Sequence, residues 1–367
     1  MSTILSRKSL NEASETEAQP PHRIDLRPAS RRVSVVVVVW NAQKYVIECL
    51  DSLQQQCDKL DLEVIVVDNA SSDGTPELVA QRYPGFHLIR NSENVGFAKA
   101  NNIGIGQSSG EYVCLVNSDV KFTDDCITPM LEYLAGHSDV AMLGPKMLAA
   151  DGHVRRSTMR FPTLWNSFCR SVGLDILFKH SRFFGGLLMA DFDHRTTAEV
   201  EVLNGWFLVV RRSALQRVGV WDPAFFMYGE DIDWCYRFRQ AGEKIVFFAG
   251  AEAIHYGGAS SANAPIRFQL EMWRASLQYW QKHHGWLAQQ MYLVSLALHH
   301  GLRLLGALAK YLLLPGQREN TRLKIDAGVA CLRWVGQMIG RPSPALGYRY
   351  SLKNVAPTYE AQSKRAS

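Results

Sequence analysis

The first third of the chain alternates between short apolar runs and segments with helical spacing. Residues 33–40 are almost all valine, which is typical of a strand buried on both faces of a parallel sheet. We expect strands at 33–40, 62–67, 87–90 and 112–116, with helices after Asn41, over 75–83 with Thr75 as N-cap, and over 98–107. This alternation with short loops predicts an α/β fold on a mainly parallel sheet flanked by helices.

The pattern after residue 119 is less regular. We expect a helix at 124–135, a strand at 140–144, a hairpin turn at Asp151-Gly152, a strand pair or bent strand at 200–211, a short helix at 214–218 capped by Ser213, a strand at 244–248 and a helix at 265–284. Residues 155–200 have no clean period, and long irregular segments are often functional lids. We interpret them as a mobile excursion for acceptor contact or membrane approach.

The C-terminal region begins with a strongly apolar stretch at 286–314. His299, Arg303 and Lys310 interrupt it on one helical face, which favours a helix lying in a membrane interface over one that spans the bilayer. A second helix is expected at 322–339. We therefore predict amphipathic, membrane-associating helices over 286–340.

The charge distribution supports that interpretation. From Met291 onward there are 11 Lys/Arg and 3 Asp/Glu, a net of +8, so the first 290 residues of this +5 chain carry about −3. An acidic-leaning body does not suit a nucleic-acid binder, whereas a basic end suits the anionic inner face of the cell membrane. The alternative is a packing helix or a dimer interface.

Two further features concern the cellular compartment of the protein and the two ends of the chain. Seven cysteines in irregular spacing, without a CxxC pair, argue for reduced thiols in the cytosol. Residues 1–32 are polar, have no signal-peptide core and are expected to form a disordered lead-in. Residues 341–367 are expected to be a basic tail.

Polar residues stand where the predicted strands end, which is where ligands bind in such sheets. Asp68 is suited to accept hydrogen bonds from a nucleobase or ribose, although an Asx turn would use the same residue. Asp119 could hold Mg²⁺ or Mn²⁺, or merely begin a turn. Residues 104–110 nearly match the dinucleotide-binding glycine pattern but precede a strand instead of following one, which disfavours a Rossmann dehydrogenase.

Three carboxylates lie within four residues at a predicted helix start. They are Glu230, Asp231 and Asp233, directly after Gly229. A carboxylate at this place is often only a cap that complements the helix dipole. On this stretch alone the cap is the favoured interpretation, and a catalytic base at Asp231 is the alternative.

The order of these motifs resembles the family 2 glycosyltransferases, and within them the bacterial rhamnosyltransferase-like branch. The resemblance covers about residues 33–285 and rests on these segments: Trp40-Asn41, Asp68-Asn69-Ala70-Ser71-Ser72-Asp73-Gly74, Asn94-Val95-Gly96-Phe97, Asn117-Ser118-Asp119, Asn204-Gly205 and Glu230-Asp231-Ile232-Asp233. It implies a GT-A fold, with a nucleotide-sugar half at about 33–123 and an acceptor half at about 124–285.

The resemblance also implies roles for individual residues. Donor contacts would come from Asn41, Asp68, Asn69, Asn94, Gly96, Asn117 and Asp119; acceptor contacts from Gly205, Trp206 and Tyr228; metal contacts from Asp119 and His255. Asp231 would be the base, with Glu230 as its alternative. Asn117 departs from the strict Asp-x-Asp motif, so we expect a metal that enters largely with the diphosphate. Arg90 and Lys99 are weaker candidates for phosphate contact than for plain surface charges.

The resulting hypothesis is an inverting, metal-dependent glycosyltransferase, peripheral on the cytoplasmic face of the membrane. Its donor would be dTDP-rhamnose or a UDP-sugar, and its acceptor a lipid-linked or cell-surface glycan precursor. Basic residues of the 265–284 helix, among them Lys282 and His283, would face a diphosphate or, more simply, solvent. The alternatives are a non-catalytic nucleotide-sugar or glycan-binding protein on the same fold, and a nucleotidyltransferase.

Overall fold

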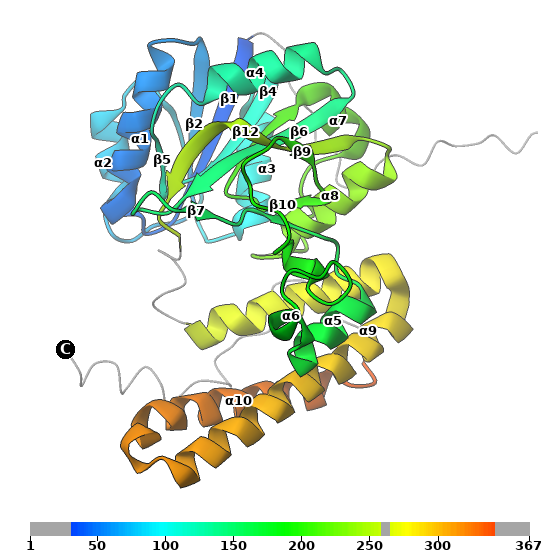
Figure 1. Cartoon of the computed structure of the whole chain (residues 1–367). Helices are drawn as coiled ribbons and strands as arrows, with labels where there is room; N and C mark the ends of the chain where they lie inside the picture. The colour runs from blue at the N-terminus through cyan, green and yellow to red at the C-terminus, as the bar shows by residue number, and fades with distance from the viewer. Residues whose placement is uncertain (1–30, 258–264, 342–367) are drawn as a thin grey trace, which may run out of the picture.

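A computed structural model describes residues 31–257 and 265–341. Most of the predicted lead-in, nearly all of the predicted basic tail, and the Ala259-Ser260-Ser261 part of the loop after His255 lie outside the described residues. Figure 1 shows a sheet with helices on both faces, and a group of helices at one end formed largely by the C-terminal region.

The nucleotide-sugar half follows the predicted alternation closely. Its elements are β1 (Arg31–Val39), α1 (Gln43–Cys57), β2 (Leu62–Asp68), α2 (Thr75–Arg82), β3 (His87–Arg90), α3 (Phe97–Gln107), β4 (Gly110–Asn117) and β5 (Val120–Phe122). The short strand β5 was not predicted. Helix α2 has Gly74 as its N-cap, in a left-handed conformation (φ 84°), so the prediction of Thr75 at that place is wrong by one residue.

The second half supplies the rest of the sheet and most of the helices. Its elements are α4 (Ile127–Gly136), β6 (Val140–Leu148), β7 (Val154–Arg155), β8 (Thr158–Met159), α5 (Leu164–Val172), α6 (Leu174–Leu177), η1 (Gly186–Leu188), β9 (Ala198–Glu199), β10 (Val202–Leu203), β11 (Phe207–Arg211), α7 (Arg212–Val218), α8 (Glu230–Gln240), β12 (Lys244–His255), α9 (Pro265–Leu313), η2 (Pro315–Gln317) and α10 (Arg318–Met338).

The strand order in the main sheet is β3-β2-β1-β4-β11-β6-β12-β5. Strands β3, β2, β1 and β4 are parallel neighbours, and β11 enters antiparallel between β4 and β6. The register pairs Val39 of β1 with Asp68 and Val38 with Asn117. The carboxyl ends of β2 and β4 therefore lie at one edge, on either side of β1.

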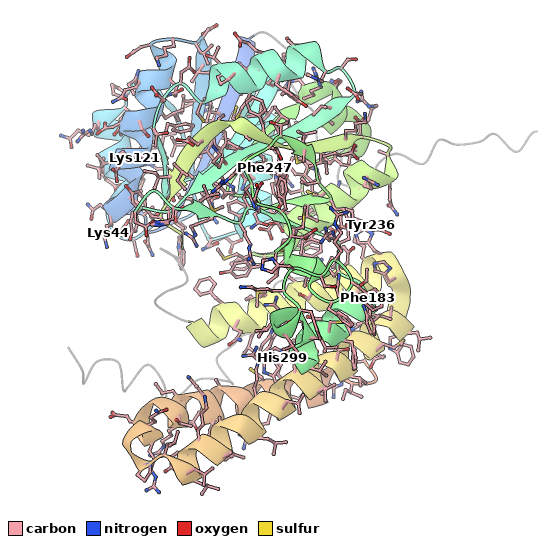
Figure 2. The ribbon with its side chains drawn as sticks, viewed as in Figure 1. Lys44, Lys121, Phe183, Tyr236, Phe247 and His299 are labelled. Atoms are coloured by element: carbon pink, nitrogen blue, oxygen red, sulfur yellow. The ribbon has the colours of Figure 1, made fainter. Side chains whose placement is uncertain are left out.

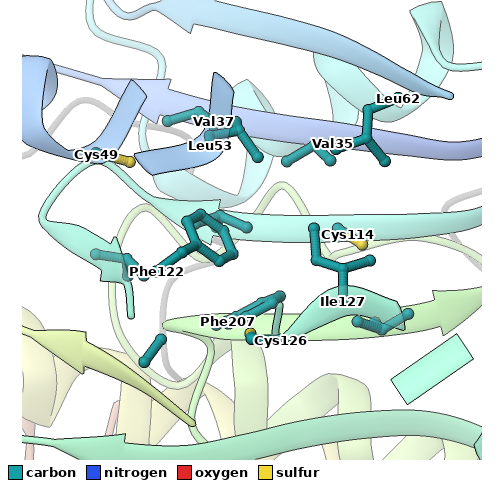
Figure 3. Packing of buried hydrophobic residues seen from close by; sticks show 14 of the residues in the cluster. Val35, Val37, Cys49, Leu53, Leu62, Cys114, Phe122, Cys126, Ile127 and Phe207 are labelled. Atoms are coloured by element: carbon teal, nitrogen blue, oxygen red, sulfur yellow. The ribbon is translucent and has the colours of Figure 1, made fainter. Parts of the chain in front are cut away.

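A hydrophobic core lies on each face of this sheet. Because β1 is central, its alternate valines enter different cores: Val35 and Val37 face one layer, and Val36 and Val38 the other. Figure 3 shows the first layer, in which Val35, Val37 and Leu53 pack near Phe122 and Phe207. The predicted burial of this strand on both faces is thereby confirmed.

The helices beyond the sheet form their own packing unit. Helix α9 is broken at Gly285 (φ 81°, ψ 175°), which separates the expected helix ending near 284 from the apolar segment that begins at 286. Leu270 and Trp273 of the first part and Leu293 of the second share a core with Cys331 of α10. Helix α5 packs on α9 as well, and Ser171 donates a hydrogen bond to the Ser295 carbonyl at 2.7 Å.

Several predictions about the second half need correction. Residues 155–200 contain α5, α6 and short strands. The segment 200–211 is a bent strand whose two parts, β10 and β11, join different sheets. Helix α4 begins at Ile127, three residues later than expected, and α7 begins at Arg212, so Ser213 lies inside it. The hairpin at Asp151-Gly152 is confirmed by the β6–β7 pairing.

All seven cysteines lie within the described residues, and none is in a disulfide. Six of them are buried, and burial raises the pKa of thiols such as Cys49 and Cys235 to about 12. These groups are therefore protonated, unreactive components of the core.

Candidate active site

Asp68 ends β2 and is almost completely buried, with 2% of its surface exposed. Its Oδ2 accepts a hydrogen bond from the Ser71 N–H at 3.2 Å, which is the Asx-type turn considered above. Its Oδ1 is buried and has no hydrogen-bond partner among the described residues. A buried acceptor without a hydrogen bond costs free energy, so a donor group of a ligand would supply the missing hydrogen bond.

Asn41 joins the loop after β1 to the loop after β2. It adopts a left-handed conformation (φ 48°), and its Oδ1 accepts a hydrogen bond from the Ser72 N–H at 2.8 Å. The Asn41 N–H donates to the Ser71 hydroxyl at 2.9 Å. These bonds hold the Asp68 loop from the outside, so Asn41 shapes this part of the site.

Asn69 and Asn94 are connected to each other. The Asn69 amide donates to Asn94 Oδ1 at 2.9 Å, and its own oxygen accepts from the Asn91 amide and the Val95 N–H. These contacts fix the loop that precedes α3. In this structure the two asparagines hold the loop beside Asp68.

Gly96 lies where that loop meets the carboxylate-bearing segment before α8. Its φ of +88° favours glycine, and a Cβ placed there would lie 2.5 Å from the Phe226 ring and 2.6 Å from the Phe226 carbonyl. The next N–H, of Phe97, donates to that carbonyl at 2.7 Å. The glycine thus permits the close approach that joins the two halves.

Asp119 and His255 lie together beyond the end of β4. His255 Nε2 is 3.1 Å from Asp119 Oδ1, and the Gly257 N–H donates to Asp119 Oδ2 at 3.1 Å. The antiparallel pairing of β5 with β12 brings the two segments together, with Val120 opposite His255. The sequence predicted both residues for one metal site, and the fold makes them neighbours across 136 residues of chain.

Asn117 completes this group. Its Nδ2 is 3.5 Å from His255 Nε2, while its Oδ1 is buried without a partner among the described residues. An amide oxygen, a carboxylate and an imidazole form a donor set compatible with Mg²⁺ or Mn²⁺. Within 31–257 and 265–341, however, no three His, Cys, Asp or Glu side chains form a metal cluster, so a bound ion would need further ligands from its substrate.

Gly205 and Trp206 connect this group to α8. The Gly205 N–H donates to Asp231 Oδ2 at 3.2 Å, and the Asn117 N–H donates to the Trp206 carbonyl at 2.9 Å. The Trp206 ring is only 2% exposed and stacks on His255, with ring centroids 5.4 Å apart. The structure thus gives Trp206 a supporting contact with the imidazole, and its acceptor role stays a prediction.

The three carboxylates of α8 have different environments. Burial raises the pKa of Glu230 well above its usual range, and the neighbouring Asp231 charge adds to the effect. Burial also raises the pKa of Asp231, against the lowering effect of the Gly205 and Ile232 N–H groups. Glu230 is 6% exposed and its Oε2 has no partner among the described residues, so it is the carboxyl more readily kept neutral.

Asp233 instead belongs to a buried ion cluster. Arg237, Lys282 and His283 approach its carboxylate at 2.9, 2.6 and 2.7 Å. Burial alone would raise the pKa of Asp233, but His283, Arg237 and Lys282 hold it below its usual range. The cluster joins α8 to the first part of α9, and Tyr236, labelled in Figure 2, packs its ring 4.4 Å from the His283 ring.

Lys282 and His283 therefore correct the expectation from the sequence. Both pair with Asp233, and Lys282, which stays partly exposed, also pairs with Asp222 at 2.7 Å. In the sequence, the acidic partners Asp222 and Asp233 precede Lys282 and His283 by 49 to 61 residues, a separation across which periodicity cannot pair charges. Asp233 is a structural carboxylate, so Glu230 and Asp231 remain as the candidates for the base.

The remaining candidates lie at the margin of the site. Tyr228 has a positive φ of 68°, and its ring lies edge-on to Phe268 of α9 at 6.3 Å. Arg90 pairs with Glu77 at 2.8 Å on the surface, and Lys99 is exposed on α3. Lys121, labelled in Figure 2, is paired with Glu48 at 2.6 Å.

Comparisons with known proteins identify the family of the chain. Residues 34–218 match the family described as Glycosyl transferase family 2. The N-acetylglucosaminyl-diphospho-decaprenol L-rhamnosyltransferase of Mycobacterium tuberculosis is 28% identical over 264 residues, which cover 69% of this chain and 85% of that protein. Rhamnosyltransferase WbbL of Escherichia coli K12 is 24% identical over 238 residues, or 61% of this chain and 83% of the relative.

A solved structure of a mannosyltransferase from Pyrobaculum calidifontis, in complex with GDP-Man and Mn²⁺, has a TM-score of 0.48 at 19% identity. The match covers 86% of this chain and 91% of the mannosyltransferase chain. The mixed, mainly parallel sheet flanked by helices is the GT-A arrangement expected from the motifs. With its family motifs in order and its strand ends converging on one site, the chain belongs to glycosyl transferase family 2.

Proposed function

We propose that this glycosyltransferase inverts the configuration of a sugar as it moves the sugar from a nucleoside diphosphate to a hydroxyl group. The observation that carries the proposal is one chain of contacts. Asp231 accepts from the Gly205 N–H, and the next residue, Trp206, contacts both Asn117 and His255. A potential base and a potential site for the leaving diphosphate are therefore held by the same loop.

The donor nucleotide would bind at the end of β2. The unpartnered Oδ1 of Asp68 can accept a hydrogen bond from the N–H of a uracil or thymine ring. The loops held by Asn41 and Asn69 would form the walls around that base. Uracil and thymine nucleotides are the first to test, because the ring N–H of either base is a donor for that oxygen, whereas cytosine and adenine have no ring N–H on their pairing edge.

The donor diphosphate would lie between Asn117, Asp119 and His255. These residues would hold a divalent metal, which when bound supplies positive charge where the leaving group becomes more negative. Because the described residues offer a single carboxylate here, the diphosphate itself would provide most remaining ligands. Metal affinity should thus depend strongly on bound nucleotide.

Asp231 would take the proton from the acceptor hydroxyl as its oxygen bonds to the anomeric carbon. The bond from that carbon to the diphosphate oxygen breaks in the same displacement, and the nucleoside diphosphate leaves with its electron pair. Two N–H groups, of Gly205 and Ile232, hold the carboxylate at 3.2 and 2.8 Å. Burial raises the pKa of Asp231, which makes its ionised form a stronger base than an exposed aspartate.

Glu230 is the weaker candidate for the base. Burial raises the pKa of Glu230 well above its usual range, which favours the neutral form, and a protonated carboxyl is a poor acceptor for the proton of a hydroxyl. Its closeness to Asp231 instead helps to keep the two carboxyls from being charged together. We therefore assign the base role to Asp231 alone.

The relatives suggest the substrates. Both rhamnosyltransferases support a rhamnose donor, and the mycobacterial protein's name specifies an N-acetylglucosaminyl-diphospho-decaprenol acceptor. We propose dTDP-rhamnose as the first donor to test, with UDP-hexoses next, and a lipid-diphosphate glycan as acceptor. Location on the cytoplasmic face of the cell membrane would give access to both.

A donor panel tests this function. Purified protein with Mn²⁺ or Mg²⁺, a lipid-diphosphate N-acetylglucosamine acceptor, and dTDP-rhamnose or each UDP-sugar should release nucleoside diphosphate in an acceptor-dependent manner. Binding of a donor without release, across the whole panel, would favour a non-catalytic binding protein. Pyrophosphate released from a nucleoside triphosphate would favour a nucleotidyltransferase.

The exposed side of α9 supports a membrane-bound location. Beyond Gly285 it carries seven apolar side chains at helical spacing, each at least 37% exposed; this α9 stripe consists of Leu287, Met291, Val294, Leu298, Leu302, Leu305 and Leu312. It extends about 38 Å along the helix. The opposite side, with Leu293 and Leu296, is buried against the other helices.

Charge favours an anionic lipid surface as the partner of the α9 stripe. Between residues 286 and 341 the chain has two acidic residues and seven exposed basic ones: Arg303, Lys310, Arg318, Arg322, Lys324, Arg333 and Arg341. Residues Phe268–Leu313 meet the length and composition of a membrane span, with a mean hydropathy of 1.2. The break at Gly285 and the charges at Arg303 and Lys310 favour a helix lying in the interface.

The double variant Val294→Glu/Leu305→Glu should detach the protein from membranes. Each substitution places a charge where an apolar group would enter the lipid, so binding to phosphatidylglycerol-containing vesicles should fall about tenfold or more. Gln54→Glu/Gln81→Glu makes the same change in net charge on exposed positions of α1 and α2 and should bind normally. If the wild-type protein does not bind these vesicles but sediments as a dimer, the α9 stripe is instead the contact surface for a second copy of the chain.

A further inference from the structure

Arg155 lies beside the proposed diphosphate site, at the start of the segment 155–200 that we interpreted as an excursion for acceptor contact or membrane approach. It belongs to β7, which the turn at Gly152 folds back along β6 so that Arg155 pairs with Met147. Its guanidinium Nη1 donates a hydrogen bond to the His255 carbonyl at 3.2 Å. The hairpin thus places the Arg155 guanidinium against the segment that carries the His255 imidazole.

Gly257 provides a second, independent contact. It has a φ of +70°, and a Cβ placed there would lie 3.0 Å from Nη1 and 3.6 Å from Nη2 of Arg155. The guanidinium therefore lies over a position that has no side chain. Because the Gly257 N–H also donates to Asp119 Oδ2, Arg155 and Asp119 contact the same three-residue stretch.

The Arg155 guanidinium has unused binding capacity. The side chain is exposed, and among the described residues no carboxylate forms an ion pair with it. One of its five N–H donors is used by the His255 carbonyl, which leaves a charged, planar fork beside the Asn117–Asp119–His255 group. Such a fork matches the oxygens of a phosphate group, which a guanidinium can bind through two parallel hydrogen bonds.

We propose that Arg155 binds the diphosphate of the nucleotide sugar and stabilises it as it leaves. This inference rests on the proposed function, because it assigns a further residue to the same site. As the glycosidic oxygen takes the electron pair of the breaking bond, the negative charge on the diphosphate increases and its attraction to Arg155 grows. The single carboxylate of the metal group makes a protein cation at this position more important.

Arg156 offers a matched comparison in the neighbouring position. It is also an exposed arginine, but its charge acts on His194, whose pKa it helps burial to lower. His194 contacts Thr158 at 2.9 Å in the short β8 segment and lies outside the diphosphate group. Substituting Arg156 removes the same charge from the same hairpin without touching residues 255–257.

The experiment compares nucleotides that differ only in phosphate. Calorimetry with Mn²⁺ should measure the affinity of wild type, Arg155→Ala, Arg155→Lys and Arg156→Ala for uridine, UMP and UDP, and for thymidine and dTDP. We expect Arg155→Ala to lower the affinity for the diphosphates roughly ten- to hundredfold and to leave the affinity for the nucleosides within twofold of wild type. Arg155→Lys should recover part of the loss, and Arg156→Ala should resemble wild type.

Two results would overturn the inference. Unchanged diphosphate affinity in Arg155→Ala would remove the contact altogether. An equal loss of affinity for nucleosides and diphosphates would show that Arg155 only stabilises the His255 segment. Failure of wild type to bind any of these diphosphates is a different result, because it would contradict the proposed donor site itself.

Discussion

Asp231→Asn should lower turnover by about 10² to 10⁴-fold, the usual contribution of a general base. The substitution keeps the shape of the side chain and an oxygen that can accept the Gly205 N–H, but it removes the group that takes the proton. Affinity for the donor should stay within about threefold, since the donor contacts come from the ends of β2 and β4. Steady-state kinetics together with calorimetry of UDP or dTDP would separate the two effects.

Glu230→Gln is the matched control for that variant. Because burial raises the pKa of Glu230 and so favours its neutral form, the amide replaces it at the same size with little change in charge, and turnover should stay within about tenfold of wild type. Turnover retained in Asp231→Asn and lost in Glu230→Gln would exchange the two roles. Loss in both, with normal unfolding transitions, would indicate that the pair acts as one unit.

The pH profile carries the same information with a defined sign. The base must be ionised, so kcat/KM should fall as pH decreases through the pKa of Asp231. Burial raises that pKa, which places the acid limb above the ordinary aspartate value of about 3.9. A limb at or below that value would contradict a buried base.

Asp119→Ala should be the second most damaging change. It removes the only carboxylate of the group that includes Asn117 and His255, and with it the acceptor of the Gly257 N–H. Mn²⁺-dependent binding of the diphosphate should weaken about a hundredfold, while binding of the bare nucleoside should not change. Calorimetry of UDP with Mn²⁺ and with EDTA measures the metal-dependent part directly.

Asp124→Ala provides the control, because Asp124 is an exposed carboxylate on the loop before α4. It should bind metal and nucleotide as the wild type does. If wild-type turnover proves equal with and without EDTA, Asp119 has no metal to hold, and its bond to Gly257 would be its main role.

Most of the nucleotide-sugar half could be predicted because its pattern and topology agree. A run of valines buried on both faces specifies a central parallel strand, and parallel strands bring their carboxyl ends to one edge. Asp68 and Asn117, predicted from strand ends, are thus both in register with the end of β1. The glycine at 96 was identified from its motif, although its reason, the contact with Phe226, needed the fold.

Contacts between distant polar residues were beyond the reach of the sequence. Nothing in the local pattern indicates that Lys282 and His283 pair with Asp233, and a basic helix surface is the more common outcome. Once formed, this cluster removes Asp233 from the candidates for the base. It also fixes the first turn of α8, which carries Asp231, against α9.

The acceptor half was predicted least well, for physical reasons. Strands β7 to β10 have two residues each, too short to show a period of two. Helix α5 was missed because Thr163 and Asn166 form its capping box without the acidic residue expected at the third position. The predicted Asp151-Gly152 turn returns the chain towards the sheet edge, but nothing in the local pattern indicates that Arg155 then contacts His255.

The most direct test of the central claim is transfer of labelled sugar to a lipid-diphosphate acceptor by wild type and by Asp231→Asn. The account predicts that wild type, supplied with dTDP-rhamnose or a UDP-sugar and Mn²⁺, forms a lipid product whose anomeric configuration by NMR is opposite to that of the donor. Asp231→Asn should form at least a hundredfold less. Product with retained configuration, or equal product from both proteins, would contradict a single displacement in which Asp231 is the base.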